Sequence, residues 1–140
     1  MKPPRIRVLS RLESLKREAL ESRARDLQKL NAEIAALEAE RNNLKEGIRS
    51  ASSEMSVEAA PFLKAYLTRL RSDMSAVDKR IADLEGLRVG HRKAVRDAFT
   101  ETKAISHVHQ REATAYRDEM ERTDAQNALE LHLMSSRSRS

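Results

Sequence analysis

The sequence contains no cysteine and no tryptophan, and only three glycines, three prolines, two phenylalanines and two tyrosines among its 140 residues. The lack of cysteine excludes a disulfide framework, a thiolate zinc site and a thiol nucleophile. Because large aromatic side chains normally supply much of the buried area of a globular core, a compact single-core domain is not expected. Scarce glycine and proline leave few places where a helix must stop, so the composition favours long helices.

Charged side chains are abundant and of both signs, with 27 Lys and Arg against 22 Asp and Glu and a net charge of +5. Their mixing argues against nucleic-acid binding, since such proteins usually segregate positive charge more clearly. The sequence has no apolar run that could cross a membrane, no secretory signal and no glycine loop that would cradle a phosphate. We therefore expect a cytoplasmic protein without cofactor, metal or catalytic centre, attached to a membrane at most peripherally.

The residues that follow Pro61 predict a long coiled-coil helix. Seam positions recur there in alternating steps of four and three residues, the 3.5-residue repeat of a left-handed coiled coil. From Arg88 onward most of these positions hold polar or small residues. We predict one helix from about residue 60 to about residue 132, in which these positions face a partner helix: Leu63, Leu67, Leu70, Met74, Val77, Ile81, Leu84, Arg88, His91, Val95, Ala98, Thr102, Ile105, His109, Glu112 and Tyr116.

The residues before Pro61 predict a second helix, from about residue 6 to about residue 52. An upstream apolar row follows steps of four, three and four residues, but it lies one residue out of phase with the rows that come later. Since Arg23 falls at a seam position near the join, we predict a local register shift there. The upstream row is Val8, Leu12, Leu15 and Ala19, and the later rows are Leu20, Leu27, Ile34, Arg41 and Ile48, with Leu30, Leu37, Leu44 and Ala51.

Residues 53–60 are predicted to connect the two helices, because clustered serines compete with helical hydrogen bonds and Pro61 suits the first turn of a helix. The predicted fold class is all-α, with two long helices forming an antiparallel coiled-coil hairpin whose second helix is the longer. A fold-back about residue 56 would place Val8 opposite roughly residue 104 and leave about 25 residues of the second helix unpaired. The lead at residues 1–5 and the Arg/Ser tail at residues 133–140 are predicted to be disordered.

Two exposed surfaces are candidates for binding a partner. The unpaired end of the second helix carries apolar residues that either await a partner or belong to a frayed helix, namely Tyr116, Met120, Leu129, Leu131 and Leu133. Phe62 and Tyr66 lie four residues apart near the connection. They either cap the ends of the two helices or form a docking patch, since aromatic side chains are enriched at interface centres.

Three further features have an ordinary structural explanation beside a functional one. Gly86 and Gly90 mark either a bend or the close approach of another backbone. The basic run of Arg88, Arg92, Lys93 and Arg96 is either a solvated face or a phosphate contact. His109 and Glu112 are three residues apart and could share a metal, but zinc needs three or four ligands and no others converge in the sequence.

These features resemble the FliJ family, the small coiled-coil component of the bacterial flagellar type III export apparatus. The resemblance covers nearly the whole chain and includes the unequal antiparallel hairpin. The segment 62–70, Phe-Leu-Lys-Ala-Tyr-Leu-Thr-Arg-Leu, is similar to the start of the family's return helix. The arginine- and glutamate-rich run around Tyr116, at residues 110–122, and the later Gln126, Leu129 and Glu130 resemble its C-terminal part.

The resemblance implies a non-enzymatic stalk protein, similar in shape to the central stalk of rotary ATP synthases. Its implied partners are the hexameric flagellar export ATPase, the cytoplasmic domain of the export gate and export chaperones. The implied gate contacts at the hairpin end are Phe62, Tyr66 and Leu70. The implied ATPase contacts on the unpaired end are Arg111, Tyr116, Arg117, Glu119, Arg122, Gln126 and Leu129. The alternatives are a homodimeric coiled-coil scaffold and a basic coiled coil that binds nucleic acid.

Overall fold

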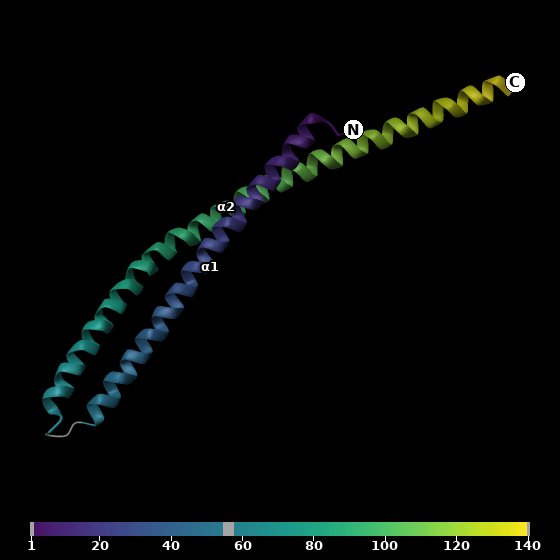
Figure 1. The fold of residues 1–140 in the computed structure, drawn as a ribbon. Coiled ribbons are helices and arrows are strands. Elements are labelled where there is room, and N and C mark those ends of the chain that lie inside the picture. Colours follow the sequence, from purple (N-terminus) through teal and green to yellow (C-terminus); the bar gives the residue numbers. More distant parts are fainter. Residues whose placement is uncertain (1, 55–57, 140) are drawn as a thin grey trace. The chain divides into compact units, whose positions relative to one another are not determined.

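The computed structural model describes residues 2–54 and 58–139 and contains two helices, α1 (Pro4–Ser53) and α2 (Ala60–Arg139) (Figure 1). The predicted all-helical hairpin with a longer second helix is confirmed. Part of the predicted serine-rich connection, residues 55–57, lies outside the described residues. Pro61 is the second residue of α2, where its missing N–H costs no helical hydrogen bond, and Leu63 N donates to Ala59 O at 2.9 Å.

Both helices extend beyond the ends that the sequence pattern predicts. α1 begins at Pro4 rather than near residue 6, with the amides of Ile6 and Arg7 donating to Pro3 O at 3.1 and 3.2 Å. α2 continues to Arg139 rather than ending near residue 132. In its last turn the Ser138 hydroxyl donates back to Ser135 O at 3.0 Å, so this serine adds a bond within the helix. Disorder of residues 1–5 and 133–140 in solution stays a prediction.

The chain divides into two compact units, each of which pairs a piece of α1 with a piece of α2. The hairpin unit comprises Glu21–Asp97, and the terminal unit comprises Met1–Leu20 with Ala98–Ser140. In each unit cross-helix ion pairs show that the two pieces run antiparallel. They join Glu33 to Arg80 and Arg41 to Asp78 in the hairpin unit, and Arg5 to Glu112 and Lys16 to Glu101 in the terminal unit.

The hairpin unit has an apolar core in the seam between its two helices. Leu30, Ile34 and Leu84 pack together with exposed fractions of 8%, 1% and 2%, and Leu37 packs against them. Arg41 stands at a seam position but stays near the surface, where its Nε lies 2.5 Å from Asp78 Oδ1. Leucine and isoleucine therefore fill the centre of the seam while ion pairs border it. The narrow seam of a two-helix coiled coil can be filled by such aliphatic side chains, so it needs few aromatic residues.

The terminal unit has a different seam from the one that the sequence predicts for the start of α1. The predicted row is wrong, because Val8 and Leu15 are 65% and 45% exposed and Ala19 is exposed as well. The buried and half-buried positions step by three and four residues instead, along Ile6, Leu9, Glu13, Lys16 and Leu20. These steps continue in phase to Leu27 and Leu30, so α1 shows no register shift near Arg23. Glu13 and Lys16 can occupy the seam because each has a polar partner on α2.

We predict that Ile34→Ala lowers the free energy of unfolding by about 2–4 kcal/mol, because the change leaves a cavity in the seam of the hairpin unit. Urea denaturation followed by circular dichroism measures the effect. Val89→Ala is the control, since Val89 is 69% exposed and its truncation should change stability by less than about 0.5 kcal/mol. Equal losses in the two variants would contradict the assignment of the core.

Candidate functional site

An exposed aromatic pair marks the start of α2. Phe62 is 80% exposed and Tyr66 is 50% exposed, and their spacing of four residues places both on one helix face. Such exposure favours a docking patch over a cap that closes the helix ends. Leu70 does not join this surface: it is 9% exposed, and a Cβ at Gly47 on α1 would lie 3.5 Å from its Cδ1. The aromatic pair, defined as Phe62 and Tyr66, is therefore the accessible part of the predicted gate surface.

The C-terminal end of α2 forms an overhang with no covering helix among the described residues. Every described side chain from Arg117 to Ser138 is exposed. Of the predicted ATPase contacts, Arg111 is exposed and Tyr116 is half-buried, and the rest lie on the overhang as Arg117, Glu119, Arg122, Gln126 and Leu129. The overhang also exposes large apolar side chains, by 43–67%, at Met120, Leu129, Leu131, Leu133 and Met134.

The register of the terminal unit differs from the one estimated from the position of the turn. Arg5 Nη2 lies 3.2 Å from Glu112 Oε1, which places the beginning of α1 beside Glu112. Glu13 meets His109 in the same unit. The estimate that Val8 lies opposite roughly residue 104 is therefore wrong, because the cross-helix pairs set the register and place α1 farther along α2. Continuous exposure, and with it the overhang, begins at Arg117.

Polar side chains hold the seam of the terminal unit together. His109 Nδ1 lies 2.5 Å from Glu13 Oε2, and the two side chains are only 22% and 14% exposed. Thr102 is buried, with its hydroxyl 2.7 Å from Ala98 O and 3.2 Å from Lys16 O across the seam. Lys16 Nζ in turn lies 2.9 Å from Glu101 Oε2. This seam depends on hydrogen bonds and ion pairs where the seam of the hairpin unit depends on leucine and isoleucine.

The Glu13 carboxylate is the charged centre of this polar seam. The hydrogen bond from His109 lowers the pKa of Glu13 below its ordinary value, with help from the Ser106 hydroxyl and the positive charges of His109 and Arg17, while burial acts in the opposite direction. Arg17 Nη2 lies 2.8 Å from Glu13 Oε1. His109 and Glu112, which the sequence offered as a possible metal pair, therefore bind Glu13 and Arg5 of α1 instead.

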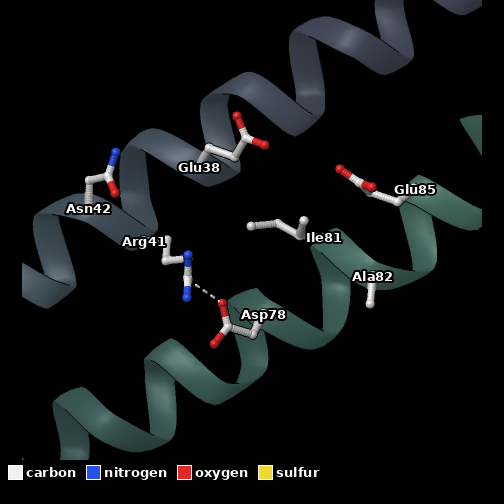
Figure 2. A pocket seen from close by; sticks show the side chains of 7 residues that line it. All are labelled: Glu38, Arg41, Asn42, Asp78, Ile81, Ala82 and Glu85. Carbon is white, nitrogen blue, oxygen red and sulfur yellow. Dashed lines mark ion pairs between the residues drawn. The ribbon is translucent and has the colours of Figure 1, made fainter.

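A polar hollow lies between the helices of the hairpin unit (Figure 2). The Arg41 side chain points from α1 toward Asp78 on α2, and Ile81 projects between the two helices. The hollow is lined by Glu38, Arg41, Asn42, Asp78, Ile81, Ala82 and Glu85. Arg41, the one arginine of the hollow, forms an ion pair with Asp78 across the seam. The coiled-coil repeat would place an apolar residue at this position, so here an ion pair joins the two helices in place of apolar packing.

The glycine pair and the basic run both lie on the α2 part of the hairpin unit. A Cβ added at Gly86 or Gly90 would meet no atom within 4 Å, so the packing of the described chain does not require glycine at either position. Arg88 is held by Glu85, with Nη2 3.0 Å from Oε1, and its side chain is 24% exposed. The basic run is therefore interrupted by an ion pair at its first member, which favours the solvated-face explanation.

The described helices include none that is both long and apolar enough to traverse a lipid bilayer. The described residues likewise contain no group of three or more histidines and acidic side chains arranged to hold a metal ion.

The model of the flagellar FliJ protein family matches residues 6–139, which is nearly the entire chain. The chain belongs to the FliJ family. No curated protein and no solved structure matches it significantly. FliJ membership makes the chain a non-catalytic component of the flagellar type III export apparatus, as the pattern of residues 62–70 and 110–122 predicts. The unequal helices and the overhang are thus features of a FliJ protein.

We predict that acid weakens the terminal unit of this FliJ protein through Glu13. Because the folded-state pKa of Glu13 is lowered, its contribution is fully present above the ordinary glutamate pKa and is lost as the pH falls through the folded-state value. Glu13→Gln should therefore cost about 1 kcal/mol at pH 6 and much less at acidic pH. Chemical denaturation at a series of pH values measures this difference.

Glu18→Gln is the control, since Glu18 lies on the same helix with an exposed side chain. A loss of stability in Glu13→Gln that stays constant from pH 6 to strongly acidic conditions would contradict a role for the ionised carboxylate.

Proposed function

We propose that this FliJ protein is the central stalk of the hexameric flagellar export ATPase, and that it links the ATPase to the export gate and to export chaperones. It acts in the cytoplasm and lies at the cytoplasmic face of the membrane when assembled. The observation that carries the proposal is the overhang, a helix with exposed side chains from Arg117 to Ser138. A single helix of this length is marginally stable in water, so a surrounding protein is needed to bury its apolar residues.

The overhang suits the central hole of a ring for two reasons. It is a single helix, which is slender enough to be surrounded by subunits on all sides. It also exposes apolar and charged side chains around its circumference, including Met120, Leu129, Arg117 and Glu119. A ring can therefore contact several helix faces at once, whereas docking on a flat surface would use only one of them.

The aromatic pair is proposed to contact the export gate. Phe62 and Tyr66 lie at the opposite end of α2 from the overhang in sequence, so both contacts can form on the same molecule. Exposed Phe and Tyr side chains are costly in water and are typical of binding hot spots. No particular surface is proposed for the chaperones.

The two alternatives have less support. A homodimeric scaffold would pair seams between chains, but Leu30, Ile34 and Leu84 already bury one another within one chain. A nucleic-acid binder would use the basic run, but Arg88 is held by Glu85.

We predict that deletion of residues 113–140 abolishes stimulation of the cognate export ATPase. The deletion keeps Glu112, the partner of Arg5, so α1 retains its pairing in the terminal unit. Steady-state ATP hydrolysis by the purified ATPase, with and without the FliJ protein, measures the effect. Helicity per residue should be retained in the truncated chain. Full stimulation by this truncated chain would rule out the overhang as the ring contact.

We predict that Phe62→Ala with Tyr66→Ala weakens binding to the cytoplasmic domain of the export gate by at least about tenfold, the usual loss at an aromatic hot spot. Both side chains are exposed, so helicity and unfolding midpoint should hardly change. Val89→Ala again serves as a control, because it removes exposed apolar surface elsewhere in the hairpin unit. Isothermal titration calorimetry gives the affinities, and an unchanged dissociation constant in the double variant would exclude the site.

A further inference from the structure

The first turns of α1 carry two complete coiled-coil rows, only one of which is used within the chain. The inner row steps by three and four residues and faces α2, along Ile6, Leu9, Glu13, Lys16 and Leu20. The outer row begins one residue earlier at each step, along Val8, Leu12, Leu15 and Ala19. Val8 and Leu15 are 65% and 45% exposed, and Leu12 is half-buried. A row with this spacing is what a helix presents to a neighbouring helix.

The outer row is the more apolar of the two at the same level of the helix. Glu13 and Lys16 occupy the inner row, while Leu12 and Leu15 lie beside them in the outer row. Leu12 and Leu15 thus lie near solvent, whereas the charged side chains of Glu13 and Lys16 lie in the seam between the helices. A groove follows this face and is lined by Pro4, Arg7, Val8, Arg11, Leu12 and Leu15.

Positive charge borders the outer row on one side. Arg7 and Arg11 lie four residues apart, line the groove and form no ion pair with any residue in the described ranges 2–54 and 58–139. On the other side, Arg5 and Lys16 are bound to Glu112 and Glu101 of α2. The guanidinium groups of Arg7 and Arg11, along one edge of the groove, are therefore the positive charges that a binding partner could pair with.

This charge distribution selects among occupants. A second copy docking antiparallel through the same row would set Arg7, Arg11 and Glu18 of both copies along one edge, and this edge would keep an excess of positive charge. An anionic membrane surface would attract Arg7 and Arg11 but would also approach the carboxylates of Glu101 and Glu112 on the neighbouring edge. A helix of another protein could pack apolar residues of the same spacing into the groove, and carboxylates along one of its flanks could form ion pairs with Arg7 and Arg11.

We propose that the outer row, Val8, Leu12, Leu15 and Ala19, together with Arg7 and Arg11, is a docking site for an amphipathic helix of another protein that carries acidic residues along one flank. The partner would form a third helix beside α1. The site lies outside the surfaces assigned above to the ATPase ring and the gate.

The test uses the full chain and two synthetic helical peptides, and it needs no export protein. One peptide has leucines in steps of four and three residues with glutamates along one flank, and the other has lysines in place of those glutamates. Fluorescence anisotropy should show that the glutamate peptide binds at least about tenfold more tightly. Val8→Gln with Leu15→Gln should weaken this binding by at least about tenfold, and Arg7→Glu with Arg11→Glu should reverse the preference between the peptides.

Val89→Gln is the matched control, because it changes an exposed valine on the other unit and should leave the affinity unaltered. The proposal is overturned if the Val8 and Leu15 changes leave peptide affinity unaltered, or if both peptides bind equally. The proposal is also overturned if the protein binds neither peptide but binds phosphatidylglycerol vesicles, and if the Val8 and Leu15 changes weaken that vesicle binding. Self-association in sedimentation that the same two changes abolish would assign the row to a second copy instead. None of these outcomes bears on the stalk proposal, since the ATPase is absent from the assay.

Discussion

The contact between Ile34 and Leu84 determines much else in this protein, because it sets which face of α1 meets α2. Both side chains are almost fully buried, and the residues that join them there, Leu30 and Leu37, follow the same spacing. In the terminal unit, the buried and half-buried positions of α1 follow the same steps of three and four residues. Counting back from Ile34 in steps of three and four residues leads to Glu13 and Ile6 and bypasses Val8 and Leu15.

Keeping one phase along α1 has an energetic consequence for the terminal unit. Its seam receives Glu13 and Lys16, whose burial would be unfavourable without partners. His109 and Glu101 supply those partners from α2, and the Thr102 hydroxyl lies within hydrogen-bonding distance of the Lys16 backbone carbonyl. Hydrogen-bonded pairs contribute less net stabilisation than buried leucines, and they fix register more strictly because each donor needs one acceptor. Polar pairs thus add to the buried aliphatic residues of the terminal unit, such as Ile6, whereas the core of the hairpin unit is apolar.

The sequence was sufficient to predict the seam of α2. Every position that the repeat assigned to its seam, from Leu63 to Tyr116, is buried or half-buried. The start of α1 was mispredicted because two rows with coiled-coil spacing overlap there, and periodicity favours the more apolar one. Only a contact with the other helix, such as Glu13 with His109, shows which row faces inward. That contact joins residues far apart in the sequence, and no local pattern reports it.

The candidate surfaces show the same limit. Phe62, Tyr66 and Leu70 form one run of spaced apolar residues in the sequence, yet Phe62 and Tyr66 are exposed while Leu70 packs toward Gly47. Helical spacing alone cannot show which of the three is buried. Each lies four residues, or slightly more than one turn, after the one before, so all three project from neighbouring parts of the helix surface. The seam position of Leu70 in the 3.5-residue repeat was the signal that could have separated it from its neighbours.

The unequal lengths of the helices leave the end of α2 without a helix of the described chain beside it. α1 meets α2 as far as Glu112, and the residues of α2 from Arg117 onward have no helix of the described chain against them. Their apolar side chains, such as Leu129 and Leu131, therefore stay exposed in the described chain. The outer row on α1 poses the same problem on another face. Both apolar surfaces lie in the terminal unit, whose own seam combines buried aliphatic residues such as Ile6 with the polar pairs of Glu13 and Lys16.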